Sequence, residues 1–276
     1  MTQKKSPPKR EVKKRYKQIE SEQIRQQYEG TTIISKQGYE VRLNKYNDAS
    51  NCELEFLNVK FPYKVNIEIR SFKNKTVRYP YHPSKYGVGY IGIGKFIGGS
   101  YSKENIIYDY WDGILRRCYS ERIKKLRNSY SDCLVDECWH NLQNFGEWFE
   151  KNYNPKYMKS WCLDKDILVK GNRIYSPETC CFVPNEINVI FTNGYIRRGE
   201  YPKGVSYKPK INKYIAQYQK DGVVTHIGTF KTVDEAFQAY KEAKEKYIKE
   251  KADKWKDQID PKVYEAMYNY QVEITD

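Results

Sequence analysis

The stretch LDKDILVKGNRIYSPETCCFVP, residues 163–184, decides the interpretation of the middle of this chain. Leu163 and Asp164 predict the end of a strand, because they close a short apolar segment before a polar loop. The loop contains Gly171 and Asn172, and the turn Pro-Glu-Thr-Cys after it leads toward Asn188. The sequence therefore predicts a strand and a polar loop that begins with three consecutive charged residues.

Two helices are predicted on the N-terminal side of this loop. Apolar residues recur at helical spacing in YDYWDGILRRCY and in DECWHNLQNFGEWFEKNY. Each stripe predicts a core-facing helix, and the aromatic residues in them are interpreted as packing residues. The two stripes are Tyr108, Trp111, Leu115 and Cys118, and Cys138, Leu142, Phe145 and Phe149.

The N-terminal third divides into two parts. Residues 1–28 contain nine Lys or Arg and three Glu. Residues 1–29 therefore predict a flexible basic arm followed by a short polar helix. Residues 30–100 predict a small antiparallel barrel or curled sheet, built from TTIIS, YEVRLNKY, CELEFLNV and KVNIEIRSF. The glycine-rich run at 81–96 is interpreted as a connection that packs against the next domain.

The C-terminal part, residues 195–276, alternates between strand and helix signals. KYIAQY and VVTHI predict two strands, joined by a tight hairpin at Asp221 and Gly222. Thr232 and Glu235 predict a capping box, followed by a helix that covers one face of the sheet. DPKVYEAMYNYQVEITD predicts a short terminal helix that begins at Pro261 and docks on a neighbouring domain.

The charge predicts a polyanionic partner. The chain has 49 Lys and Arg against 35 Asp and Glu, a formal net charge of +14 and a pI near 9.2. Such a surface attracts nucleic acid through release of condensed counterions, although a merely solubilising surface is the alternative. No apolar run is long enough for a membrane span, so we expect a soluble, cytoplasmic protein in a bacterial host cell, associated with the nucleoid. Seven irregularly spaced cysteines are expected to be thiols.

The middle part, residues 101–194, resembles phage HNH-like proteins related to homing endonucleases. The resemblance is carried by YWDGILRRCY, SDCLVDECWHNLQNFGEWF and LDKDILVKGNRIYSPETCCFVPNEIN. It implies two strands and a helix that hold one divalent metal ion, Mg²⁺ or Mn²⁺, which would stabilise charge on the scissile phosphate. By this resemblance Asp164 matches the metal-binding aspartate, and Lys165 stands in place of the histidine base.

Lys165 is a serious departure, because a lysine that is protonated at neutral pH cannot accept a proton from water unless burial or neighbouring cations lower its pKa strongly. Asp166 could serve as ligand or base, and Glu178 as a further carboxylate, which gives the metal set Asp164, Asp166 and Glu178. His140 could fold toward the loop as a base, and Lys165 could instead contact a phosphate. In the alternative interpretation Asp164 only caps the loop or pairs with a cation. The cysteine spacing favours buried thiols over a structural zinc.

Residues 201 to about 247 resemble the APETALA, or ethylene-response-factor, DNA-binding domain. The carrying blocks are GVSYKPKINKYIAQY, HIGTF and TVDEAFQAYKEAK. The resemblance implies a three-stranded sheet that lies in the major groove of double-stranded DNA, with the helix behind it. Lysine, serine and glutamine replace the family's arginines and tryptophans, so weaker or different base preference is expected. The implied DNA-binding residues are Lys203, Ser206, Lys208, Lys210, Lys213, Gln217, Gln219 and His226.

Together these features predict a multi-domain α+β protein of phage or mobile-element type. The first functional hypothesis is a metal-dependent HNH-like homing endonuclease that hydrolyses DNA phosphodiester bonds. The second is a catalytically inactive DNA-binding regulator or blocking protein, which the missing histidine favours. A third, RNA binding, rests on 27 tyrosines that could stack on bases.

Overall fold

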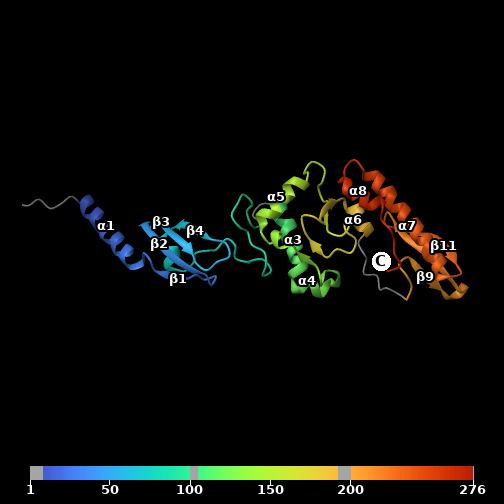
Figure 1. Ribbon diagram of the computed structural model, residues 1–276, viewed down its shortest axis with the longest axis horizontal. Helices are drawn as coiled ribbons and strands as arrows, with labels where there is room; N and C mark the ends of the chain where they lie inside the picture. Colours follow the sequence, from blue (N-terminus) through green and yellow to red (C-terminus); the bar gives the residue numbers. More distant parts are fainter. Residues whose placement is uncertain (1–8, 100–104, 192–199, 276) are drawn as a thin grey trace, which may run out of the picture. The chain divides into compact units, whose positions relative to one another are not determined.

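The computed structural model describes residues 9–99, 105–191 and 200–275 of the chain (Figure 1). It is a mixed α+β protein with several small sheets, as the sequence predicts. The chain forms two compact units, residues 1–95 and 96–276. The residues predicted as separate nuclease-like and DNA-binding parts both lie in the second unit. Among the helices of the described segments, none has the length and apolar character that a membrane span requires.

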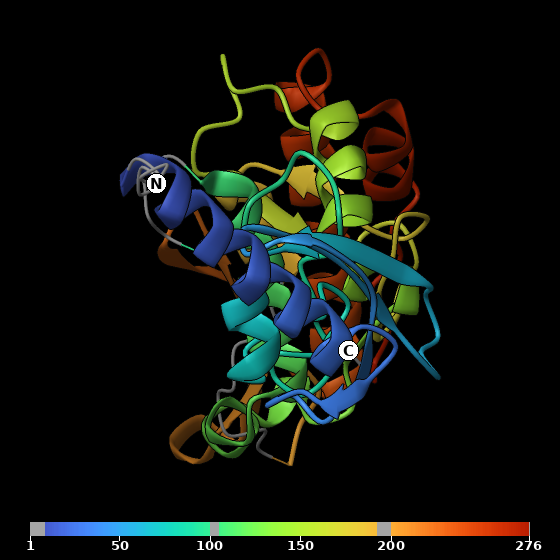
Figure 2. The same cartoon turned by 90° about the vertical axis from the view of Figure 1, so that its left-hand side faces the viewer.

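The first unit is a four-stranded antiparallel sheet with a helix at each end of its sequence. Strands β1 (Thr32–Ile34), β2 (Glu40–Asp48), β3 (Asn51–Phe56) and β4 (Tyr63–Ile67) are hydrogen-bonded in chain order. Alternate residues of β2 and β3 are fully buried, because only one face of the sheet meets the core. Helix α1 (Lys9–Tyr28), the dark blue helix in Figure 2, packs on this core through Ile24 and Tyr28.

Three predictions for this unit need correction. The predicted small antiparallel sheet is present, but of the two forms expected for it the barrel is excluded, because the sheet is open with β1 and β4 at its edges. The predicted strand 64–72 ends at Ile67, and Ile69–Lys73 forms helix α2, which buries Ile69 and Phe72 in the core. The helix expected to be short has 20 residues and includes much of the basic arm, while residues 1–8 lie outside the described part.

The second unit begins with helices that pack through their predicted stripes. Helix α3 (Ile106–Tyr119) buries Tyr108, Trp111, Leu115 and Cys118, and α4 (Glu121–Leu126) and a short 3-10 helix, η1 (Asn128–Tyr130), follow. Helix α5 (Leu142–Asn152) buries Leu142, Phe145 and Phe149.

The predicted second stripe fails only at its first member, Cys138. This residue is exposed and belongs to a separate 3-10 helix, η2 (Glu137–His140). The two helices are distinct because the side chain of Asn141 caps α5 by accepting from Gln143 N at 3.0 Å. Phe96 ends the glycine-rich connection and packs over Gly146 of α5, where an added Cβ would lie 2.4 Å from its ring.

The nuclease-like stretch folds as strand, loop, strand and helix. Strands β6 (Cys162–Asp164) and β8 (Cys181–Val183) pair antiparallel, and helix α6 (Asn185–Phe191) follows at once. The short strand β7 (Ile174–Tyr175) pairs in parallel with β5 (Leu134–Val135). This order of elements agrees with the two strands and helix that the resemblance implies, without establishing a relationship to that family.

The C-terminal residues form a three-stranded antiparallel sheet under a long helix. Strands β9 (Val205–Lys208), β10 (Lys213–Lys220) and β11 (Val223–Phe230) lie in the order β11-β10-β9, with η3 (Pro209–Ile211) between the first two. Asp221 and Gly222 form the two-residue hairpin turn with φ values of 50° and 84°, the left-handed conformations that such a turn requires.

Helix α7 (Val233–Trp255) covers one face of this sheet, and α8 (Pro261–Tyr268) follows. The predicted capping box is present: Glu235 N donates to Thr232 Oγ1, and Thr232 N donates to Glu235 Oε2. Ala236, Phe237 and Tyr240 form the core with Ala216 of β10. This packing leaves the opposite face of the sheet, termed the outer face below, for solvent.

Candidate functional site

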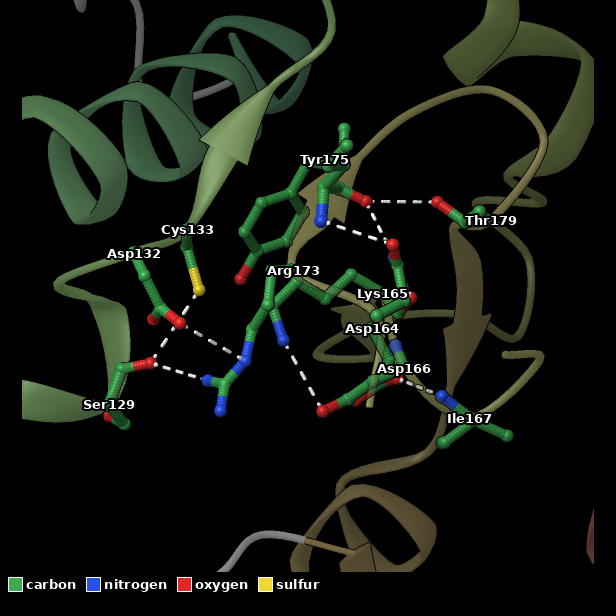
Figure 3. A network of polar contacts seen from close by, with 12 residues as sticks. Ser129, Asp132, Cys133, Asp164, Lys165, Asp166, Ile167, Arg173, Tyr175 and Thr179 are labelled. Carbon is green, nitrogen blue, oxygen red and sulfur yellow. Dashed lines mark hydrogen bonds and ion pairs between the residues drawn. The ribbon is translucent and has the colours of Figure 1, made fainter. Parts of the chain in front are cut away.

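Asp164 organises the start of the polar loop. Its Oδ1 atom accepts hydrogen bonds from the backbone N–H groups of Asp166 and Ile167, both at 2.9 Å (Figure 3). Asn172 closes the loop from the other side, because its amide donates to Lys165 O at 2.6 Å and to Ile174 O at 2.7 Å. The loop is therefore held by side chains that satisfy its own backbone, the local role that the alternative interpretation gives to Asp164.

Lys165 occupies a buried position in this loop. Its side chain is only 9% exposed, and its Nζ atom lies 3.3 Å from Asp166 Oδ2. The same ammonium group lies 5.9 Å from the centre of the Tyr175 ring (Figure 3). Lys165 is therefore engaged by the Asp166 carboxylate and the Tyr175 ring within the protein.

Asp164 and Asp166 form a pair of interacting carboxyl groups. Burial and the negative charge of Asp166 raise the pKa of Asp164 to about 6, although the two backbone N–H groups favour its charged form. Two such carboxyl groups can share a proton or bind a cation. This pair is the part of the predicted metal set that the fold brings together.

Glu178 and His140 lie elsewhere on the unit. Glu178 is exposed in the turn before β8, and its charge, after burial and Asp136, helps raise the pKa of Cys138. His140 is at the end of η2, where its Nε2 atom lies 3.3 Å from the hydroxyl group of Tyr119. Thr179, in the same turn as Glu178, is engaged locally, because its Oγ1 atom donates to Ile174 O at 3.0 Å.

Within residues 9–99, 105–191 and 200–275, no three His, Cys, Asp or Glu side chains gather in a group that could hold a metal ion. The set Asp164, Asp166 and Glu178 does not converge, and His140 does not complete it. The donor set therefore does not fit the complete HNH site. Two carboxylates remain, which is the number through which Mg²⁺ is often bound together with water.

The seven cysteines are all thiols in this structure. Burial raises the pKa of Cys118 to about 12 and also raises the pKa values of Cys180 and Cys181. Zinc is bound by the deprotonated thiolate form of cysteine, which a raised pKa disfavours. These buried thiols are packed in the core as small apolar side chains.

Six of the eight predicted DNA-binding residues belong to the strands of the C-terminal sheet, and pairing places them on its outer face. Directly opposed residues of an antiparallel pair share a face. Ile215 lies opposite Ser206, and Gln217 lies opposite His226. The six residues are Ser206, Lys208, Lys213, Gln217, Gln219 and His226. Ser206 is half-buried, and the other five are exposed.

A β-bulge keeps His226 on this face. Ala216 lies opposite Gly228 and Gln217 lies opposite His226, so Ile227 is the extra residue on β11. Ile227 packs into the core under α7. The bulge thus lets two consecutive residues, Ile227 and Gly228, face the helix without turning His226 inward.

The other two predicted DNA-binding residues lie off the outer face. Lys203 precedes β9, and its charge, after burial, helps to lower the pKa of Lys244 on α7 to about 8. Lys210 is exposed in η3, the turn between β9 and β10. The resemblance assigned both residues to the groove face without using the alternation of the strands.

Three outer-face residues were missed by the sequence interpretation: Ile215, Val224 and Thr229. Ile215 lies between Ser206 and Thr229 on the neighbouring strands, and Val224 lies opposite Gln219. The alternation along β10, once combined with the hairpin turn at Asp221 and Gly222, is the signal that could have found them.

Comparison with known proteins found no relative: no protein-family profile, no curated protein and no solved structure matches this chain. The relationships to HNH-like nucleases and to APETALA-type domains therefore remain predictions from the motifs, and the functional argument depends on the geometry described above.

Proposed function

We propose that this protein binds double-stranded DNA through the outer face of the β9–β10–β11 sheet. The observation that carries the proposal is that Lys208 and Lys213 lie directly opposite each other on neighbouring strands. Both are exposed. Like charges at opposed positions destabilise a sheet, whereas a phosphate group bound between them would be attracted by both. The pair is therefore better explained by a polyanionic ligand than by the stability of the sheet.

The surrounding charge and shape support the same ligand. Residues 201–230 contain five lysines and one aspartate. The major groove of B-form DNA is wide enough for a two-stranded ribbon, and α7 braces the back of this sheet. Lys210 extends the basic corner made by Lys208 and Lys213, because η3 connects their strands.

Helix α1 offers a second phosphate-binding segment. Lys13, Lys14, Arg15 and Lys17 are exposed on it, and only its C-terminal end packs on the first unit, through Ile24 and Tyr28. Contacts from these cations to phosphate groups would add affinity that does not depend on the DNA sequence.

The loop at 164–172 favours a non-catalytic role. Lys165 is buried against Asp166, the three acidic residues of the predicted metal set do not converge, and the loop is closed by its own hydrogen bonds. We therefore give first place to a DNA-binding regulator or blocking protein.

A metal-dependent endonuclease is the second candidate, and the Asp164–Asp166 pair favours it. Burial and, after it, the negative charge of Asp166 raise the pKa of Asp164, and a cation would relieve the repulsion between the two carboxylates. Bound there, Mg²⁺ or Mn²⁺ would supply Lewis-acid stabilisation of charge on a phosphate.

Binding is tested by fluorescence anisotropy with a short labelled duplex over a series of KCl concentrations. The double variant Lys208→Ala/Lys213→Ala should bind more weakly, and its salt slope should fall by about 0.9 for each phosphate that the variant no longer neutralises. Lys203→Ala is the matched control, because its side chain lies toward α7. Equal slopes for the double variant and the wild type would refute the assignment of this face.

Catalysis is tested by incubating supercoiled DNA with Mg²⁺, Mn²⁺ or EDTA. The regulator hypothesis predicts binding without nicking. Metal-dependent nicking that disappears in Asp164→Ala would instead establish the endonuclease, with a catalytic site that works without a histidine at position 165.

A further inference from the structure

Two glutamines stand on the outer face of the central strand. Gln217 and Gln219 are exposed at alternate positions of β10. Gln219 Nε2 donates to Gly222 O at 3.2 Å, which holds its amide toward the hairpin turn. An amide offers a donor and an acceptor side by side. Adenine displays the matching pair in the major groove, through its N6 amino group and N7.

An apolar side chain lies next to these amides. Val224 is 64% exposed and directly opposite Gln219. Its neighbour Val223 is equally exposed, at 67%, but lies opposite Lys220, which faces α7 and pairs with Glu250 at 3.1 Å. Only Val224 of the two therefore lies on the outer face, where the C5-methyl group of thymine is the apolar feature of the major groove.

The side chains that commonly bind guanine, arginine and lysine, do not lie beside the two glutamines on the outer face. No arginine occurs between residues 200 and 231, and arginine makes the commonest bidentate contact to guanine. The outward lysines, Lys208 and Lys213, lie at the η3 end of the sheet, away from the hairpin end where Gln219 and Val224 are paired. They are placed to contact phosphate while the glutamines face base edges.

We propose that the outer face selects A·T base pairs in the major groove, with Gln217 and Gln219 reading adenine and Val224 contacting the thymine methyl group. This inference rests on the proposed function, since it requires this face to enter the groove. It adds the class of base pair that the protein prefers and the residues that determine the preference.

The first test is selection of bound sites from a random duplex pool by the full-length protein. The wild type should enrich sites with consecutive A·T pairs. Gln217→Ala should reduce the affinity ratio between an enriched site and its G·C-substituted counterpart by about 5- to 100-fold, the range for one bidentate contact. Gln238→Ala is the matched control, because Gln238 is an exposed glutamine on α7, behind the sheet.

The second test removes single groups from the DNA. Replacing adenine by 7-deazaadenine removes N7 and should weaken binding of the wild type but not of the double variant Gln217→Ala/Gln219→Ala, which lacks both adenine-reading amides. Replacing thymine by uracil removes the methyl group and should weaken wild-type binding by about 3-fold, the equivalent of one buried methyl. Val224→Ser should abolish this sensitivity, and Val223→Ser should keep it.

The outcomes separate this inference from the function on which it rests. Absence of DNA binding would overturn both. Salt-sensitive binding through Lys208 and Lys213 without an A·T preference would overturn the inference alone. So would enrichment of G·C sites that is abolished in His226→Ala, because guanine would then be read by the histidine opposite Gln217.

Discussion

Lys251 of α7 donates a hydrogen bond to the carboxylate of Glu186 on α6. The same carboxylate accepts from Lys254 Nζ at 2.7 Å and from Trp255 Nε1 at 3.1 Å. Lys251 also pairs with Asp221 in the hairpin turn. The helix that braces the proposed DNA-binding sheet is thereby joined to the helix that follows the nuclease-like strands, so the two parts share one partly buried polar network.

Removing Lys251 should destabilise the second unit. The side chain is 9% exposed, and although burial opposes it, the hydrogen bonds with Asp221 and Glu186 raise the pKa of Lys251. Lys251→Met removes this cation from Asp221 and Glu186, while Glu186 keeps its bonds to Lys254 and Trp255, and we expect a loss of about 1 to 2 kcal/mol in the free energy of unfolding. Urea unfolding followed by tryptophan fluorescence reports this unit alone, because all five tryptophans lie in it.

The matched control for this experiment is Lys246→Met. Lys246 is exposed on the same helix, and its replacement should change stability by no more than about 0.5 kcal/mol. Equal midpoints for the two variants would show that the network contributes nothing to the fold.

Asp164 should make the stability of the second unit depend on pH. Its pKa is raised to about 6 in the folded state, above the ordinary aspartate value of about 3.9. The folded state therefore binds the proton more tightly, and wild-type stability should rise as the pH falls from about 7 to 4. Asp164→Asn keeps an oxygen for the two backbone N–H groups and removes the charge, so it should lack this rise.

The size of this pH effect on stability follows from how far the pKa of Asp164 is raised. At pH 8 Asp164→Asn should be more stable than the wild type by about 1 to 3 kcal/mol, and the difference should disappear near pH 4. Added Mg²⁺ separates the two candidate functions in the same assay, because a site on the Asp164–Asp166 pair would raise the melting temperature of the wild type only. A difference that is constant across this pH range would contradict the carboxyl pair.

Gly204 should not tolerate a side chain. Its φ is +81°, and a Cβ added there would lie 2.0 Å from the Tyr240 ring. Gly204→Ala should cost both backbone strain and displacement of a buried ring, about 2 to 4 kcal/mol together. Gly222 has a similar φ of +84° with open space around it, so Gly222→Ala should cost only about 1 kcal/mol. Thermal unfolding of both variants compares the two costs, and equal losses would mean that Tyr240 moves aside freely.

Structural features that depend on residues close together in the chain were predictable from the sequence. The capping box of Thr232 and Glu235, the turn at Asp221 and Gly222, and the buried stripe of α3 all follow from short spacings and local hydrogen bonds. The start of the second stripe, at Cys138, was not predictable, because a single Asn141 cap divides η2 from α5.

Features that depend on distant residues were not predictable. Glu186 and Lys251 are separated by 65 positions, and neither has a local pattern that identifies its partner. In the candidate site the acidic pair was predictable, since Asp164 and Asp166 are two residues apart. The failure of Glu178 to join them depends on how the turn before β8 packs, which the spacing does not encode.

Replacement of Lys213 should stabilise the free protein and weaken its binding to DNA. It is exposed directly opposite Lys208, and neither side chain has a carboxylate partner among the residues that the structure describes. Lys213→Gln removes the like-charge repulsion and should stabilise the free protein by about 0.2 to 1 kcal/mol, while it weakens binding to duplex DNA. Addition of a duplex should raise the melting temperature of the wild type more than that of the variant, because stabilisation by a ligand follows its affinity. Lys246→Gln, on the exposed side of α7, should change neither quantity. A variant that is less stable than the wild type and binds DNA equally well would show that the lysine pair is structural, and the outer face would then need another ligand.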